Sequence, residues 1–203
     1  PHFTFNALNA IQEQLLTKDA MSAVNYLADF AKLIRKTLDM FDRSYISLKE
    51  DVEFLKTYIK LELIRHAQPI QVVWNIDPQL DLEQWAIPPM LVQPLIENAF
   101  KHGLISTIKS PKLSICFIQN PTDLYICVED NGIGLKNSLK NKSRFNTNQS
   151  KGMSLIRARL SILPSENGDK SSLKLEDLSK ENSGKSGTRV SITIPLSQCS
   201  KLK

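Results

Sequence analysis

The stretch PPMLVQPLIENAFKHGL joins an apolar run to four polar side chains: Glu97, Asn98, Lys101 and His102. Asn98 and Lys101 lie three residues apart, so a helix would place them on one face. A carboxamide oxygen can ligate Mg²⁺, and a lysine can neutralise phosphate oxygens. The stretch therefore predicts a binding place for a metal-bound phosphate. The alternative, that it is the polar end of a helix facing solvent, explains the stretch about as well.

The stretch VEDNGIGL places Asp130 at the end of a predicted strand, followed by Gly132 and Gly134. A carboxylate there can accept a hydrogen bond from an adenine amino group, and the glycines let backbone amides approach a ligand. A tight turn after an edge strand is the alternative, because Asn-Gly is a common turn dipeptide. The stretch is not a dinucleotide fingerprint, since the third glycine and the βαβ context are missing.

The stretch SKGMSLIRARL places Gly152 at the predicted start of a helix. Free amides at a helix N-terminus bind phosphate oxygens, although an ordinary helix start has the same pattern. Residues 136–152 just before it are basic and rich in Asn and Ser, which is typical of a lid or a disordered loop. Positive charge on a lid would suit a polyphosphate ligand.

The elements that position these stretches are strands and helices in alternation. Short runs rich in Val, Ile and aromatic residues predict strands: IQVVWNID, KLSICFIQ, DLYICVED, SLKLED and TRVSITIP. Helical segments are expected over 89–103 and 152–163. The second two-thirds of the chain is therefore expected to be an α+β sandwich, with helices on one face of a mixed sheet.

The spacing of apolar residues in the first third of the chain is typical of helices. Residues 2–40 predict an antiparallel helical hairpin, and its second helix carries a heptad-like seam that requires a partner helix: Val24, Leu27, Ala31, Ile34 and Leu38. A capping box of Ser47 and Glu50 begins a third helix, with Leu48, Val52, Leu55 and Ile59 on one face. We expect a hairpin over 1–46, a connecting helix over 47–68 and an α/β domain over 69–203.

Composition narrows the functional classes. A net charge of +5 without an aromatic-interleaved basic stripe disfavours nucleic-acid binding. The apolar residues make up 41% of the chain, but their densest run is broken by prolines and is too short for a membrane helix. Three cysteines without metal-ligand spacing indicate a reducing compartment, and Cys116 and Cys127 are expected in adjacent strands as core residues. A chain that opens on Pro1 is expected to have been cut from a longer one.

Taken together and in this order, the three stretches and the GTRVSITIP strand resemble the ATP-binding fold of histidine kinases, DNA gyrase, MutL and related chaperones. The segments PHFTFN, LKEDVEFLKTYIKLELIR and IPPMLVQPLIENAFKHG are similar to the LytS-type sensor histidine kinases of bacterial two-component systems. The resemblance runs over nearly the whole chain. It implies a truncated phosphoacceptor hairpin followed by a Bergerat-type α/β ATP-binding domain.

The same resemblance implies the roles of individual residues. His2 of the PHF motif would accept the phosphate, Asn98 would ligate Mg²⁺, and Asp130 would read adenine. The lid would be framed by Gly132, Gly134 and Gly152, and the remaining nucleotide-side candidates are Lys101, His102 and Thr188. His102 is equally well explained as a solvated helix end, and Thr188 as a plain strand residue. Glu97 is a candidate base, because Phe3 stands where many histidine kinases have an acidic residue.

The pattern departs from the family at the second glycine box, where Ser150, Met153 and Leu155 replace the usual residues. We expect altered lid closure rather than lost nucleotide binding. The implied activity is ATP-dependent autophosphorylation in a homodimer, followed by transfer to a response-regulator aspartate. The implied location is the cytoplasmic portion of an inner-membrane protein, anchored through a segment outside this chain. An ATP-binding scaffold without autokinase activity is the alternative, while an ATPase or anti-sigma-type kinase is disfavoured by His2 and the heptad seam.

Overall fold

The computed structural model describes residues 20–66, 68–104, 108–134, 148–163, 170–180 and 186–201. A mixed five-stranded sheet forms its larger part, in the order β2-β4-β5-β7-β6. The strands are β2 (Gln71–Ile76), β4 (Lys112–Gln119), β5 (Asp123–Asp130), β6 (Ser172–Asp177) and β7 (Thr188–Pro195). The pair β2–β4 is parallel and the other pairs are antiparallel. The strands predicted from the sequence are confirmed.

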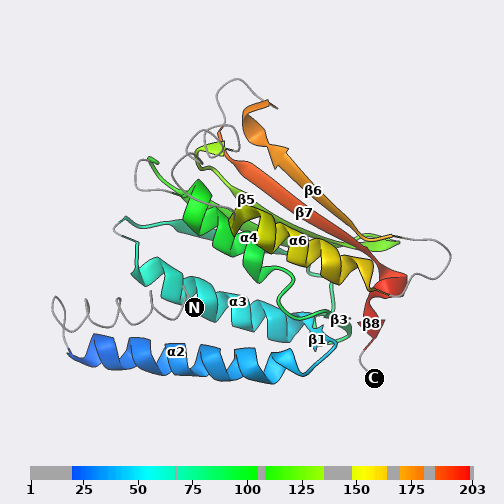
Figure 1. Cartoon of the computed structure of the whole chain (residues 1–203), viewed down its shortest axis with the longest axis horizontal. Coiled ribbons are helices and arrows are strands. Elements are labelled where there is room, and N and C mark those ends of the chain that lie inside the picture. The colour runs from blue at the N-terminus through cyan, green and yellow to red at the C-terminus, as the bar shows by residue number, and fades with distance from the viewer. Residues whose placement is uncertain are drawn as a thin grey trace.

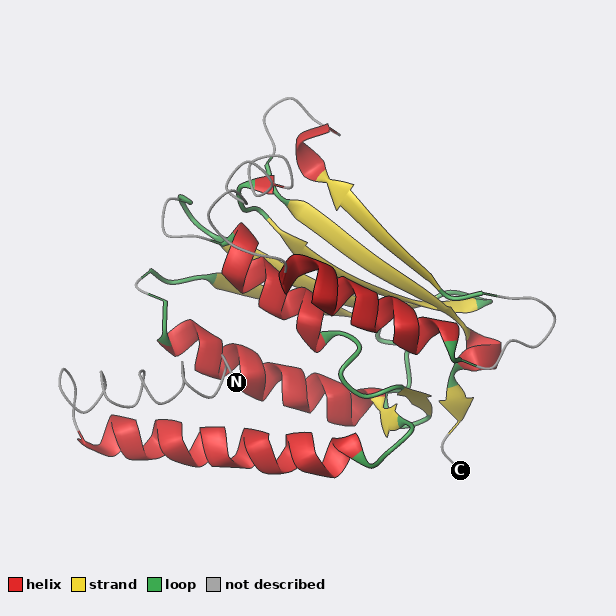
Figure 2. Cartoon of the chain, viewed as in Figure 1, coloured by secondary structure: helices red, strands yellow, loops and turns green. Residues whose placement is uncertain are grey.

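Two helices cover one face of this sheet: α4 (Gln93–Asn98) and α6 (Asn148–Ser161) (Figure 1). Period-2 alternation turns the apolar residues of the central strands toward them, such as Ile115, Ile126 and Ile192, which are fully buried. Ile156 of α6 and Leu95 of α4 fill the same core. Figure 2 shows the layers, with the helices α2 (Ala20–Phe41) and α3 (Leu48–Ile64) on the far side of α4 and α6 from the sheet. The predicted α+β architecture is thus confirmed.

Helix α4 begins four residues later than the predicted helix over 89–103. Two prolines precede it, and Met90 has a φ of 59°, a left-handed conformation that cannot continue a helix. The guanidinium of Arg159 on α6 donates to the carbonyl oxygens of Pro89 and Met90 at 2.5 and 2.7 Å. The segment before α4 is therefore a turn held by α6.

Helix α3 starts as the sequence predicts. The backbone N–H of Glu50 donates to the Ser47 hydroxyl at 3.1 Å, and the backbone N–H of Ser47 donates to the Glu50 carboxylate at 3.0 Å. The four apolar residues expected on one face are all buried. The pKa of Glu50 is lowered to about 2, mainly by its hydrogen bond with Arg43.

Helix α2 packs on α3 through a different face from the predicted seam. The buried residues of α2 are Ala23, Tyr26, Phe30, Leu33 and Met40, whereas Val24, Leu27 and Leu38 are 58%, 49% and 61% exposed. The seam prediction stays a prediction, because the first helix of the predicted hairpin lies outside the described residues. Against α3 the helix instead turns Tyr26 and Phe30, which are 2% and 9% exposed and carry large apolar rings. The seam remains on the outside.

A second, three-stranded sheet was not predicted. It consists of β1 (Ile46–Ser47), β3 (Trp85–Ile87) and β8 (Ser200–Lys201) in the order β1-β3-β8. These strands are too short to show a period. The small sheet joins the loop before α3 to the end of the chain, and the apolar core runs without a break from α2 to β7. The predicted domain boundaries stay predictions.

No helix in the described part of the chain is long and apolar enough to cross a membrane. The first helix of the predicted hairpin, with His2, and most of the basic segment before α6 lie outside the described residues.

Asp51 on α3 is expected to make the stability of the fold depend on pH. The carboxylate is buried, its Oδ2 has no partner among the described residues, and desolvation raises its pKa from 3.8 to about 7. Because the folded-state pKa lies above the unfolded one, its contribution to stability is present at low pH and is lost as the pH rises through about 7. We expect the free energy of unfolding to fall by roughly 1.4 kcal/mol from pH 6 to pH 8 through this group.

Urea denaturation of Asp51→Asn measures this effect, since the amide has a similar shape and cannot ionise. The variant should lose that part of the decrease with pH, whereas the exposed α2 variant Asp39→Asn should retain it. An unchanged pH dependence in Asp51→Asn would mean that the carboxylate finds solvent or a partner.

Candidate nucleotide site

Three polar residues lie side by side at the ends of the neighbouring strands β5, β7 and β6. In the strand register Thr188 is opposite Asp130 on one side and opposite Asp177 on the other. Both carboxylates are buried, while Thr188 is partly exposed. Asp130 and Thr188 were predicted as site residues, and the fold brings them together.

Asp130 is 5% exposed. Its Oδ1 accepts a hydrogen bond from the backbone N–H of Gly132 at 2.9 Å. Burial raises the pKa of Asp130 to about 6, while backbone hydrogen bonds from Gly132 and Thr188 oppose that rise. The carboxylate is thus mostly ionised at pH 7 and can accept a further hydrogen bond from an amino group.

Glycines allow the backbone around Asp130 to pack closely. A Cβ at Gly132 would overlap the backbone carbonyl group of Gly103, and one at Gly103 would lie 2.5 Å from Oδ1 of Asp130. Gly187 has a φ of 138°, and a Cβ there would overlap the carbonyl oxygen of Asp130. A side chain at any of these positions would displace the carboxylate or the strand end that carries it.

Gly134 follows with a φ of 75°, a left-handed conformation that favours glycine. A Cβ at this position would lie 3.3 Å from Oδ1 of Asp177. The same oxygen accepts hydrogen bonds from the backbone N–H and the hydroxyl of Ser179, at 3.1 and 2.5 Å. Asp177 therefore holds the turn at the end of β6, and a side chain at position 134 would crowd it.

Asn98 is the last residue of α4, and the π-helix η1 (Ala99–Gly103) continues the chain from it. The Asn98 side chain is partly exposed, and its Nδ2 lies 3.9 Å from the position of a Cβ on Gly152. Glu97 forms an ion pair with Lys101 one turn later. Asn98 and Lys101 were predicted to contact a metal-bound phosphate from one helix face. They differ in that Lys101 already has a carboxylate partner.

Gly152 lies inside α6 rather than at its start. The helix begins at Asn148, so the prediction that the free N-terminal amides include that of Gly152 was wrong. The four residues from Asn148 to Lys151 contain neither Gly nor Pro and tolerate helical conformation, so the helix can extend further back. Gly152 still faces α4, with Cβ of Pro94 at 3.7 Å from its own Cβ position.

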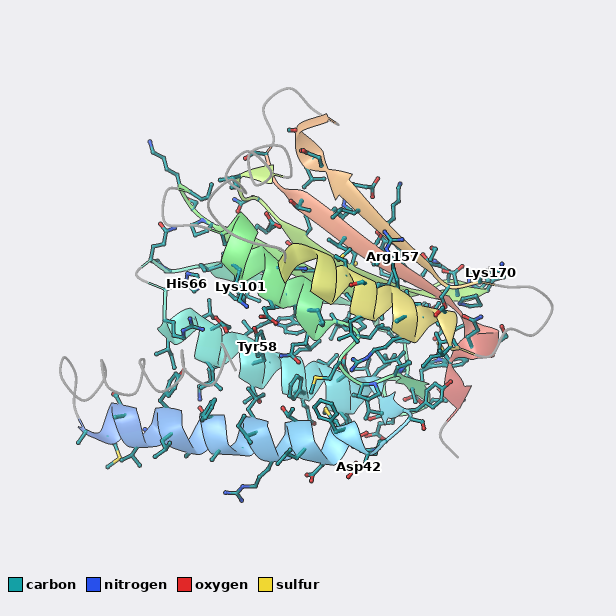
Figure 3. The ribbon with its side chains drawn as sticks, in the orientation of Figure 1. Asp42, Tyr58, His66, Lys101, Arg157 and Lys170 are labelled. Carbon is teal, nitrogen blue, oxygen red and sulfur yellow. The ribbon has the colours of Figure 1, made fainter. Side chains whose placement is uncertain are left out.

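A hydrogen-bonded set of polar side chains on α3 lies close enough to this region for Glu62 to interact with the charge of Glu97. Tyr58 and Glu62 of α3 form a side-chain hydrogen bond, and Arg65 donates to Glu62 at 2.9 Å. Burial raises the pKa of Glu62, and the negative charge of Glu97 adds to that rise. The ring of His66 lies 5.2 Å from that of Phe100 in η1. Figure 3 shows Tyr58, His66 and Lys101 between α3 and the helices above it.

Several residues of the site were not predicted. Gly103 and Gly187 lie against Asp130, and Asp177 lies next to Gly134. The sequence signal for the glycines was their position next to His102 and Thr188, but Asp177 stands in an ordinary strand and has no such signal. His2 lies outside the described residues, as does the side chain of His102.

Comparison with known proteins places the chain among kinases. The family model described as Histidine kinase matches residues 1–70. The sensor protein LytS of Oceanobacillus iheyensis is 28% identical over 208 residues, covering all of this chain and 34% of the relative. LytS of Bacillus subtilis is 32% identical over 135 residues, which is 66% of this chain and 22% of the relative. The chain belongs to the LytS-type sensor histidine kinases.

Other relatives agree with this membership. The sensor histidine kinase BtsS of Escherichia coli K12 is 32% identical over 162 residues, which cover 79% of this LytS-type chain and 27% of the relative. The chain thus spans between 22% and 34% of the lengths of the LytS relatives that it matches. Among solved structures, the histidine kinase domain of the Erythrobacter litoralis EL346 blue-light activated kinase has a TM-score of 0.54 at 16% identity. The match covers 98% of the present LytS-type chain and 96% of the EL346 kinase domain, which shows that the two share a fold.

Proposed function

We propose that this chain is the ATP-binding and phosphoacceptor part of a sensor histidine kinase. It binds ATP at the sheet edge formed by Asp130 and Thr188, transfers the γ-phosphate to His2, and passes it to an aspartate of a response regulator. The observation that carries the proposal is the buried Asp130 carboxyl group beside Thr188, in a chain related to sensor kinases over its whole length. A carboxylate that accepts from the adenine amino group distinguishes adenine from guanine, which has an oxygen there.

Glycine backbone and polar side chains would hold the phosphates. Gly132 and Gly134 let the backbone after Asp130 come close to a ligand, while Asn98 and Gly152 face each other across α4 and α6. Asn98 fits a Mg²⁺ ion, because a carboxamide oxygen is a hard ligand and the side chain is partly open to solvent. The ion would neutralise charge on the phosphates. Lys101 and His102 are the further phosphate-side candidates.

The chemical step needs a neutral imidazole. A histidine with an ordinary pKa near 6.5 is mostly neutral at pH 7, so a ring nitrogen of His2 can attack the γ-phosphorus as its bond to the ADP oxygen breaks. The ring then releases its N–H proton. Glu97 is the candidate acceptor, and it forms an ion pair with Lys101. Alignment of donor and acceptor supplies most of the catalysis in this class of reaction.

A homodimer is supported by the seam on α2. Besides Val24, Leu27 and Leu38, the side chains of Met21 and Phe41 are 66% and 68% exposed. The positions from 24 to 41 follow a heptad spacing, as in helical bundles. We propose that a second copy covers this seam, and that a membrane segment elsewhere in the protein leaves the present chain on the cytoplasmic side.

Labelling tests the proposed activity. The intact protein, incubated with ATP carrying a labelled γ-phosphate, should acquire an acid-labile, base-stable label that maps to His2 and disappears in His2→Gln. Transfer of that label to a purified response regulator should follow. Label on serine, or nucleotide binding without any label, would contradict the proposal and favour an ATP-binding scaffold.

The metal assignment predicts a magnesium-dependent defect. Asn98→Ala should weaken ATP binding by roughly 10- to 100-fold when Mg²⁺ is present, since the bridged phosphates lose one of few protein ligands. In EDTA the variant and the parent should bind alike by calorimetry. The exposed β2 variant Asn75→Ala should behave as the parent in both buffers, and equal weakening with and without Mg²⁺ would place Asn98 away from the metal.

A further inference from the structure

Two cysteines lie directly opposite each other on neighbouring antiparallel strands. Cys116 of β4 pairs with Cys127 of β5 in the strand register. Opposite residues of an antiparallel pair have Cα atoms about 4.5 to 5.5 Å apart, which is within the range that a disulfide spans. Both residues are free thiols, and a side-chain hydrogen bond already joins them.

Strand alternation places the pair on the face of the sheet away from α4 and α6, the two helices that cover the other face (Figure 1). Ile115 and Ile126 point into the core, so the alternation of each strand turns Cys116 and Cys127 outward. Cys116 is partly exposed and Cys127 is buried among its neighbours on this face. A small oxidant can therefore reach the pair from solvent without opening the core.

The surroundings of the two sulfur atoms differ. The pKa of Cys127 is lowered, first by the hydrogen bond from Cys116 and also by one from Tyr125, which together outweigh the opposing effect of burial. The pKa of Cys116 is raised by the same hydrogen bond and by burial. A thiolate is the reactive form of cysteine, so Cys127 is the nucleophile of the pair.

We propose that Cys116 and Cys127 are a peroxide-oxidised thiol pair that closes to a cross-strand disulfide. The Cys127 thiolate attacks an oxygen of hydrogen peroxide, the O–O bond breaks, and the departing hydroxide leaves as water, which gives a sulfenic acid. The Cys116 sulfur then attacks the sulfenic sulfur, and the displaced hydroxide takes the thiol proton as a second water. Two thiols are oxidised to one disulfide, and one peroxide is reduced to two waters.

Cys199 is the internal control. It precedes β8, far along the chain from the pair, and burial raises its pKa to about 12. Its thiol is therefore protonated at neutral pH and unreactive toward peroxide.

Peptide mass spectrometry of the peroxide-treated, alkylated chain tests the proposal. We expect a peptide pair linked through Cys116 and Cys127, reversed by dithiothreitol, at doses that leave Cys199 as a thiol. The reference is free cysteine at the same concentration. If both residues remain thiols when half of the free cysteine is oxidised, or if the linkage joins two chains or involves Cys199, the proposal is wrong.

Single variants assign the two roles. Cys116→Ser should trap a sulfenic acid on Cys127 that reacts with dimedone, because the resolving thiol is missing. Cys127→Ser should give no dimedone adduct at Cys116 at the same dose. Circular dichroism checks that both variants remain folded, and adducts of equal yield in the two variants would overturn the assigned roles.

Discussion

Replacing Gly132 with alanine is expected to destabilise the protein by roughly 3 kcal/mol and to abolish nucleotide binding. The added methyl group would overlap the backbone carbonyl group of Gly103, which cannot move as a flexible side chain can. The backbone N–H of Gly132 also donates to Asp130, so a shift of the loop removes the group that orients the carboxylate. The same displacement therefore acts on the fold and on the site.

Gly152→Ala is the matched control for stability. The nearest atoms to its Cβ position are at 3.7 and 3.9 Å, which is ordinary contact, and alanine is the better helix former by about 1 kcal/mol. Its midpoint in urea should be unchanged or higher, while that of Gly132→Ala should fall. If the two variants were equally stable and bound nucleotide alike, the close contact between Gly132 and Gly103 would not exist in solution.

Replacing Asp130 with asparagine is expected to weaken ATP binding by roughly 10- to 100-fold while the fold becomes more stable. The variant keeps the shape of the side chain but removes the charge, and its amide can present a donor to the adenine amino group. The preference for ATP over GTP should fall by a similar factor. A competition assay with a fluorescent nucleotide measures both quantities.

Stability is expected to rise although affinity falls, because ionising the buried Asp130 costs free energy in the folded state. Its folded-state pKa of about 6 lies above the ordinary value of 3.8, so its contribution to stability is present at low pH and is lost as the pH rises through about 6. At pH 8 Asp130→Asn should therefore be more stable by up to roughly 3 kcal/mol. Asp123→Asn, at the other end of β5, should change neither affinity nor selectivity. A variant that lost stability and affinity together would indicate a structural role only.

Much of the fold could be predicted from the sequence because local signals decide it. The alternation in TRVSITIP and the capping box of Ser47 and Glu50 each depend on residues within a few positions of one another. The start of α4 could not be predicted as reliably, since Met90 adopts a left-handed conformation that a hydrogen bond from Arg159 on a distant helix supports. The short strands of the small sheet have no period and form only through distant partners.

The seam on α2 illustrates the limit most clearly. The heptad spacing of Val24, Leu27 and Leu38 predicts a row that requires a partner helix, and α3 packs against the other row, that of Tyr26 and Phe30. One sequence carries both rows, since a helix with apolar residues on two faces has two surfaces to bury. Only the position of α3 decides which face is inside.

From the sequence alone the family and the strands could be predicted, and so could candidate site residues such as Asp130, Gly132 and Thr188. The folded chain was needed to show that Asp177 stands beside Thr188, that Gly103 and Gly187 enclose Asp130, and that Lys101 is paired with Glu97. Most of these contacts join residues that are distant in the chain. The pair of Lys101 and Glu97 depends on the local geometry of the helix that carries both. Strand register and the close approach of backbones select the distant contacts, and neither leaves a periodic signal in the sequence.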